Sequence, residues 1–370
     1  MSQSKRLHFK DIDSLRFFAL IPVFLFCVFF LTQTESEGFH YELATLMRYI
    51  KQNSIDFFFF ISAFLLTSHG LREYKYTNSF SLRDFYVRRV FRLVPLLLVG
   101  ILFAFVVHPW IMNTLKLHPL ESPSFYGYLM LVPNYFSTAR PEQYIYLAII
   151  WTVFMFLQFY VVWGIVLKYG KTQLDKIAIV CIAVGVLSRM IRVLMDIPFE
   201  FDTLSYGVPI GMGGILAKMV RNDSPYLEKI KLIPKKLFLP IYLIGLFLVL
   251  VGYVVSGNFI YVSLVPLLTC TFYAFVIIDQ TFGKNSIVKF RNNKVFSHLG
   301  KISFGILVYQ SIIGVMIVIG IESLDFEISS PAVKIAVAFV GFAISWIVAD
   351  LSYNFLEKPL LRLRREFKRA

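Results

Sequence analysis

Residues 14–32 read SLRFFALIPVFLFCVFFLT and carry a single charged side chain, Arg16. A helix that crosses a membrane needs about 20 predominantly apolar residues. Comparable stretches follow near residues 54–70, 89–107, 145–167, 177–195, 204–217, 237–255, 259–278, 302–321 and 332–355. The sequence therefore predicts an all-α polytopic membrane protein, a bundle of about ten transmembrane helices.

The composition agrees with this class. Hydrophobic residues make up 57% of the 370 residues and charged residues 16%, whereas about a quarter of an average globular chain is charged. Disordered, collagenous and disulfide-scaffold classes are excluded. The three cysteines, Cys27, Cys181 and Cys270, all lie in apolar runs, and their wide spacing predicts neither a disulfide framework nor a metal site.

The basic residues indicate the orientation. Lys and Arg number 30 on the side of the predicted bundle that holds the N-terminus and 7 on the other side. Because Lys and Arg accumulate in cytoplasmic loops, both termini are expected in the cytoplasm. The net charge of +14 is then explained by topology, and no nucleic-acid partner is needed.

No stretch between the predicted spans reads as a separate soluble domain, so we expect one membrane domain over residues 1–370. The longest outside segment, residues 108–144, contains five prolines and is expected to form an irregular extracytoplasmic cap. Within it, residues 125–136 are apolar but too short to span, which predicts an interfacial or re-entrant segment.

Charged residues inside apolar runs are candidate functional groups, because charge in lipid is costly unless paired or used. Asp13 and Arg16 share a helix face at the cytoplasmic start of the first span, either as a functional pair or as an interfacial pair at the helix end. Asp56 opens the second apolar run, where it could cap a helix or serve as a functional carboxylate.

Arg88, Arg89 and Arg92 lie at the cytoplasmic edge of the third span. Arg89 and Arg92 share a helix face, and two guanidinium groups so placed can clamp a phosphate or pyrophosphate. The alternative is an ordinary positive-inside anchor.

The order of several motifs resembles the acyltransferase-3 family of integral membrane O-acyltransferases. The likeness runs over residues 12–365, and the segments that carry it are IDSLRFFA at 12–19, SIDFFFFISAFLL at 54–66, FSLRDFYVRRVFRLVP at 80–95, LGKISFGILVYQ at 299–310 and SYNFLEKPLL at 352–361.

The resemblance implies transfer of an acyl group, usually acetyl, from cytoplasmic acyl-CoA to a hydroxyl of an extracytoplasmic envelope glycan. Arg16, Arg88, Arg89 and Arg92 would then hold the donor or its entrance. The implied setting is the bacterial inner membrane, with acetyl-CoA or another acyl-CoA as donor, no metal, and the bilayer, an envelope glycan or lipid-linked acceptor and another membrane protein as partners.

The chain departs from the family pattern where proton transfer is expected. The first-helix histidine of the family is Cys27, the late-helix histidine is Gln310, and two glutamates are Phe156 and Leu157. Glutamine cannot accept a proton, and a thiol in apolar surroundings is a poor base. The candidate catalytic positions are therefore Cys27, Asp13, Asp56 and Gln310.

Cys27 has two interpretations. It could carry the acyl group as a thioester, which would need a nearby base or positive field to form the thiolate, or it could pack as a small hydrophobe. His108 and His118 lie in the predicted cap, where one of them could supply a base to an acceptor or simply be solvated.

Three functions remain open: an envelope acyltransferase with altered site chemistry, a catalytically degenerate relative that acts as a scaffold or partner subunit in envelope or polysaccharide assembly, and a transporter. The transporter is ranked third, because the sequence reveals neither intramembrane charge pairs near the midplane nor inverted repeats.

The predicted topology can be tested with reporter fusions and labelling. A cysteine placed at Asn113 should react with an impermeant reagent from the extracytoplasmic side, because the loop charges divide 30 to 7. Labelling from the cytoplasmic side alone would contradict this topology.

Overall fold

The computed structural model describes residues 10–31, 39–117, 125–137, 148–222, 224–254, 258–287, 289–290, 293–324 and 331–363. All regular elements in these ranges are helices, as the sequence predicted. The longer ones are α1 (Lys10–Leu31), α2 (Phe39–Thr77), α3 (Leu82–Leu102), α7 (Ala148–Tyr169), α8 (Leu174–Leu194), α9 (Gly207–Arg221), α11 (Lys235–Val254), α12 (Phe259–Phe282), α14 (Ser303–Ser323) and α15 (Pro331–Ser352).

Short helices connect or extend the long ones. They are α4 (His108–Leu115), α5 (Phe125–Leu129), α6 (Pro133–Ser137), α10 (Pro225–Lys231), α13 (Lys294–Lys301) and α16 (Lys358–Leu363), with 3₁₀ turns η2 (Lys171–Gln173) and η3 (Thr203–Tyr206) and π-helical turns η1 (Phe103–Val107) and η5 (Tyr353–Glu357). The π-helical turns lie inside continuous helices, so α3, η1 and α4 form one rod, as do α15, η5 and α16.

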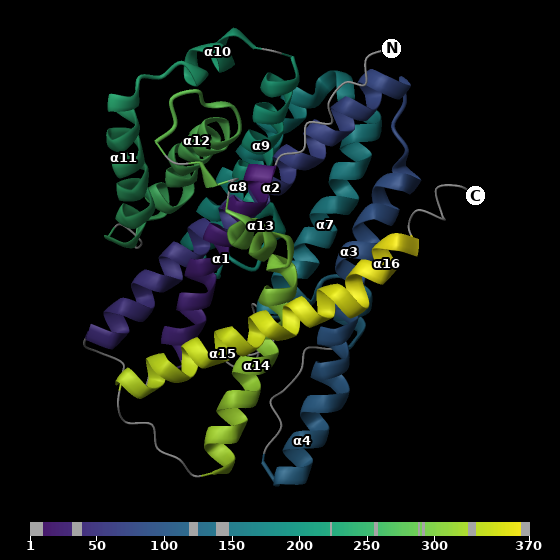
Figure 1. Ribbon diagram of the computed structural model, residues 1–370, viewed down its shortest axis with the longest axis vertical. Helices are drawn as coiled ribbons and strands as arrows, with labels where there is room; N and C mark the ends of the chain where they lie inside the picture. Colours follow the sequence, from purple (N-terminus) through teal and green to yellow (C-terminus); the bar gives the residue numbers. More distant parts are fainter. Residues whose placement is uncertain are drawn as a thin grey trace.

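The helix α2 packs against both α1 and α9, and also contacts α11, α12 and α7. The helices α10, α11 and α12 gather at one side, and α15 and α16 run obliquely across α14 towards α3 (Figure 1). The last helices of the chain thus lie beside α3, which is near its beginning.

Seven helices or helix runs in the described residues are long and apolar enough to cross a membrane, or eight if the bent pair α10 and α11 is one span. Seven of the ten predicted spans correspond to these helices, and α11 corresponds to an eighth. Of α1, which has 22 residues, the structure describes the side chains from Ile12 to Phe26. The helix α9 has 15 residues, about 22 Å against a hydrocarbon core of about 30 Å. The count of ten and the sides of the termini stay predictions.

Glycines permit the close packing of α8 against α9. A methyl group built on Gly185 would lie 2.6 Å from the backbone nitrogen of Val208, and one on Gly207 would overlap the carbonyl oxygen of Cys181. Small residues let membrane helices approach at the backbone. Any side chain at Gly185 or Gly207 would separate α8 from α9.

The apolar segment at 125–136 forms the short helices α5 and α6, and no span passes through it. Gln158 of α7 donates hydrogen bonds to the Leu131 carbonyl at 2.5 Å and to Asn134 Oδ1 at 2.9 Å, and Asn134 donates to the Phe201 carbonyl at 2.8 Å. These bonds satisfy backbone groups of an irregular segment, as burial requires. Residues 108–115, which open the predicted cap, are helical and continue α3; residues 118–124 and 138–144 of that cap lie outside the described residues.

Asp202, the N-cap of η3, contacts the helix α6 through Tyr135. Its carboxylate accepts hydrogen bonds from Ser188 at 2.5 Å and Tyr135 at 2.9 Å and lies 3.0 Å from Arg192 Nε. Burial alone would raise the pKa of the Asp202 carboxyl, but these bonds and the Arg192 charge outweigh it and lower that pKa. Burial and the neighbouring carboxylate raise the pKa of Tyr135 to about 12.

We expect Asp202→Asn to destabilise the protein by roughly 1–3 kcal/mol at pH 7, because Arg192 would lose its buried partner. A carboxyl whose pKa is depressed by folding stabilises above its unfolded pKa, and this contribution is lost as the pH falls through the folded pKa. The difference in thermal unfolding midpoint between wild type and Asp202→Asn should therefore become smaller below about pH 4.

The control is Asp196→Asn, at a nearby exposed aspartate. Equal unfolding midpoints for wild type and Asp202→Asn at pH 7 would contradict the role given to this carboxylate.

Candidate functional site

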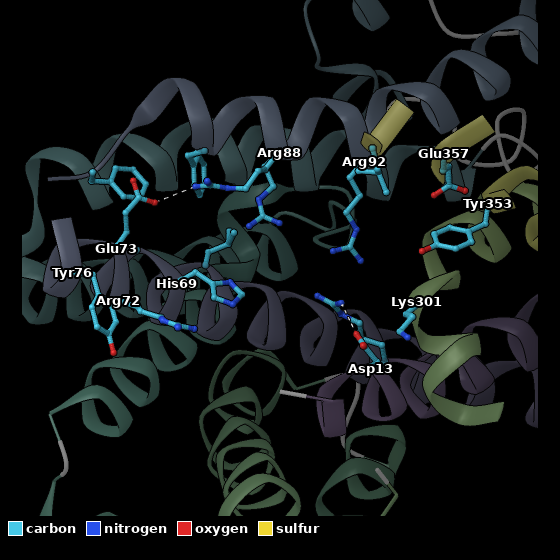
Figure 2. A pocket seen from close by; sticks show the side chains of 17 residues that line it. Asp13, His69, Arg72, Glu73, Tyr76, Arg88, Arg92, Lys301, Tyr353 and Glu357 are labelled. Carbon is cyan, nitrogen blue, oxygen red and sulfur yellow. Dashed lines mark hydrogen bonds and ion pairs between the residues drawn. The ribbon is translucent and has the colours of Figure 1, made fainter. Parts of the chain in front are cut away.

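A cavity of about 650 Å³ opens where α1, α2 and α3 meet the end of α13, η5 and α16. Six basic side chains line it against three acidic ones (Figure 2). The basic side chains are Arg16, Arg72, Arg88, Arg89, Arg92 and Lys301, and the acidic ones are Asp13, Glu73 and Glu357. We call this cavity the arginine pocket; its excess of positive charge suits an anionic ligand.

The helix α3 supplies three of the arginines. Its first turn is closed by Ser81, whose hydroxyl accepts a hydrogen bond from the Asp84 backbone nitrogen at 3.2 Å, a common N-terminal cap. From this start, the positions 88, 89 and 92 fall within about one helical turn of each other and line the cavity together with residues of α1 and α2. All four predicted donor-binding arginines, Arg16 included, line the same pocket.

Ion pairs neutralise only part of this charge. Arg16 lies 3.4 Å from Asp13, and Arg88 lies 3.2 Å from Glu73. Glu73 also accepts a hydrogen bond from the Ser81 backbone nitrogen at 2.8 Å, which holds the loop before α3. Within the described residues, Arg89 and Arg92 have no ion pair.

Aromatic rings hold these two arginines instead. The Arg89 guanidinium carbon lies 5.5 Å from the ring centres of both Phe85 and Tyr160, and that of Arg92 lies 5.3 Å from the Phe304 ring. Arg89 Nε is buried without a hydrogen-bond partner in the described part of the chain. Cation–π contacts orient a guanidinium and leave its donors available, as an anion site requires.

The π-helical turn η5 brings Glu357 into the pocket. A π-helical turn shifts the side chains that follow it relative to an α-helix, and such turns are frequent at functional sites. Glu357 is 5% exposed, and its Oε1 atom has no hydrogen-bond partner among the described residues. A buried polar atom without a partner is uncommon enough to require an explanation.

The four predicted catalytic positions are not gathered in one place. Asp13 lines the arginine pocket, whereas Asp56 and Gln310 do not. Gln310 is buried on α14. Cys27 belongs to α1, but its side chain lies outside the described residues.

Asp56 forms a buried ion pair with Arg189 of α8 at 2.5 Å. Arg189 also donates through Nε to the Ser205 carbonyl at 2.8 Å. The interpretation of Asp56 as a helix cap is wrong, because α2 begins at Phe39 and Asp56 lies well inside it. The pair joins two candidate spans, so the described residues contain an ion pair between spans that the sequence did not reveal.

The two positions where the family has glutamates are part of the core. Phe156 stacks on Phe59 with ring centres 4.2 Å apart and meets the edge of Phe304 at 5.3 Å. Leu157 is buried as well. An aromatic ring and an aliphatic side chain therefore stand on α7 where the resemblance implies two glutamates.

The histidines differ in their surroundings. His108 is buried, and neither of its ring nitrogens has a hydrogen-bond partner in the described ranges. His69 lines the arginine pocket, and His298 Nε2 lies 2.6 Å from Asp350 Oδ1. His118 lies outside the described residues.

Comparison with known proteins identifies the family. The model of the Acyl_transf_3 family, described as acyltransferase domain, matches residues 9–350. The chain belongs to the acyltransferase-3 family.

Its relatives include O-acetyltransferases. The peptidoglycan O-acetyltransferase OatA of Listeria monocytogenes is 23% identical over 338 residues, which cover 83% of this chain and 50% of that protein. The O-acetyltransferase OatA of Staphylococcus aureus is 24% identical over 377 residues, covering 95% of this chain and 57% of that protein. The chain thus spans about half the length of the curated relatives it matches. No solved structure matches it.

Family and fold together establish an integral membrane protein of the acyltransferase-3 family. Several residues of its pocket were missed by the sequence analysis, namely His69, Arg72, Glu73, Lys301, Tyr353 and Glu357. The first three and Tyr76 lie at positions i, i+3, i+4 and i+7 of α2, which is the spacing of one helix face, so the sequence did contain a signal for them. The contribution of Lys301, Tyr353 and Glu357 depends on tertiary packing and had no local signal.

Proposed function

We propose that this protein is a membrane O-acyltransferase of the bacterial cytoplasmic membrane. In this proposal the arginine pocket binds the phosphate groups of an acyl-CoA, with acetyl-CoA as the expected donor. The acyl group passes to a hydroxyl of a cell-envelope glycan or a lipid-linked acceptor, and the names of the O-acetyltransferase relatives support this reaction class.

The proposal rests on the surroundings of the Arg89 and Arg92 guanidinium groups. Both guanidinium groups are fixed by aromatic rings and have no ion pair among the described residues. Phosphate oxygens accept paired, charge-assisted hydrogen bonds from a guanidinium, so a pyrophosphate would satisfy donors that the protein leaves open. An ordinary anchor in a cytoplasmic loop would not require a cavity of about 650 Å³ around it.

The transfer step needs a group that accepts a proton. The acceptor oxygen attacks the thioester carbonyl, the carbon–sulfur bond breaks, and the hydroxyl proton passes through a base to the departing CoA thiolate. We propose His108 as this base, because its buried imidazole has both ring nitrogens without a partner in the described residues. General-base catalysis contributes about 10² to 10⁴ in rate.

The distance from Arg92 to His108 determines how far the arm of the donor must reach. His108 follows Arg92 by 16 residues on the continuous run Leu82–Leu115, which corresponds to about 24 Å of helix. The arm of the donor must therefore extend from the arginine pocket through much of the bundle. Cys27, 11 residues beyond Arg16 on α1, could shorten this path if it carried the acyl group as a thioester.

The buried Phe156 favours a second candidate, a catalytically degenerate relative that serves as a scaffold or partner subunit in envelope or polysaccharide assembly. Its ring is packed between Phe59 and Phe304 at a position where the family has a carboxylate. A transporter is a third candidate, supported by the buried Asp56–Arg189 pair, since ion pairs inside a bundle can line a substrate path.

The donor site is tested by combining Arg89→Gln with Arg92→Gln. Each substitution removes a charge-assisted contact worth about 1.5–3 kcal/mol, so CoA affinity should fall by at least about tenfold for each. The control is Arg83→Gln, an exposed arginine of the same helix outside the pocket. CoA affinity is measured by calorimetry. Unchanged affinity in the folded double variant would contradict the donor site and would mean that these arginines are ordinary positive-inside anchors.

The base is tested by assaying acyl transfer from acetyl-CoA in proteoliposomes. His108→Gln should lower the rate by about 10² to 10⁴, and Cys27→Ala should leave it nearly unchanged. A rate that survives His108→Gln would contradict the proposed base.

The same assay identifies the other candidates. A silent wild type that gains activity with Cys27→His would indicate a degenerate relative that has lost its base. Loss of activity in Cys27→Ala, together with an acyl-thioester trapped by mass spectrometry, would indicate a covalent relay through Cys27.

A further inference from the structure

The two ends of the arginine pocket differ in chemistry. Figure 2 places Tyr76, Arg72 and Glu73 at one end and Glu357, Tyr353 and Lys301 at the other, with His69 and Arg88 between them. Residues 66 to 76 of α2 line the pocket, which corresponds to about 15 Å of helix. An elongated ligand therefore meets different groups at its two ends.

The end at Tyr76 is open and offers flat surfaces. Tyr76 is 59% exposed, and the Arg72 guanidinium carbon lies 5.5 Å from the centre of its ring. Aromatic rings and guanidinium planes both stack on nucleobases, with little regard to which base is bound. This end suits a purine ring.

The end at Glu357 offers a hydrogen-bond acceptor; Lys301, at the same end, is exposed. The Glu357 side chain is 95% buried, and its Oε1 atom lacks a partner among the described residues. A carboxylate repels phosphate but accepts hydrogen bonds from amide N–H or hydroxyl groups. An acceptor without a partner inside a cationic pocket thus points to a ligand part that is uncharged and donates hydrogen bonds.

We infer that the donor binds in one direction, with its adenine on Tyr76 and Arg72, its phosphates against Arg88, Arg89 and Arg92, and its pantetheine arm at Glu357. This inference rests on the proposed function, because it assigns the parts of a CoA to the parts of the same pocket. CoA carries a purine at one end, phosphates in the middle and an arm with amide N–H and hydroxyl donors, in the order in which the pocket presents stacking surfaces, arginines and a carboxylate.

The direction is tested with the two halves of the ligand, ADP and phosphopantetheine, titrated separately with CoA as reference. Tyr76→Ala should weaken ADP and CoA about tenfold, the usual loss on removing one stacking ring, and leave phosphopantetheine unchanged. The control is Tyr169→Ala, which removes an exposed tyrosine outside the pocket and should change none of the three affinities.

Glu357 is tested by two substitutions that separate charge from hydrogen bonding. Glu357→Met removes the acceptor and should weaken phosphopantetheine about tenfold relative to ADP. Glu357→Gln keeps an acceptor oxygen without the charge and should weaken it less. Retained ADP binding in both variants reports an intact pocket.

The outcomes distinguish a wrong binding direction from a wrong donor site. If CoA binds but Tyr76→Ala weakens phosphopantetheine rather than ADP, or if both Glu357 variants strengthen both ligands equally, the direction is overturned and the donor site stands. If neither CoA nor its halves bind the folded wild type, the proposed function and the direction both fall.

Discussion

Guanidinium groups stacked on aromatic rings at the edge of an apolar bundle are the interaction on which the arginine pocket depends. Phe85, Tyr160 and Phe304 hold Arg89 and Arg92 from α3, α7 and α14, so three helices must pack correctly before the two charges are placed. Charge in such a position is costly unless it is paired, stacked or used. Here the rings supply the support, beside a cavity that both arginines line.

Much of the fold and the basic half of the site could be predicted from sequence, because they depend on local patterns. The apolar runs predicted the helices, and the spacing of Arg88, Arg89 and Arg92 predicted a shared face. The partners of Asp56 and Glu357 could not be predicted in this way. Arg189 lies 133 positions beyond Asp56, and Glu357 meets the arginines only because a π-helical turn and the crossing of α15 over α14 bring it there.

Two positions where the resemblance implies glutamates, Phe156 and Leu157, are buried in the core. Phe156 is buried and contacts the rings of Phe59 and Phe304, so aromatic contacts occupy the place of an expected carboxylate. The proposed donor site does not involve these two positions, because neither Phe156 nor Leu157 lines the arginine pocket. This explains why the arginine pocket and the catalytic step must be judged by separate measurements.

A photoreactive CoA analogue, followed by mass-spectrometric mapping of the labelled peptides, addresses the donor site without any substitution. The pocket predicts labelling confined to the segments that line it, residues 13–16, 66–92, 301 and 353–361, and competition by unlabelled CoA. Labelling elsewhere in the bundle that CoA suppresses would contradict the assignment, as would labelling of these segments that CoA leaves unchanged.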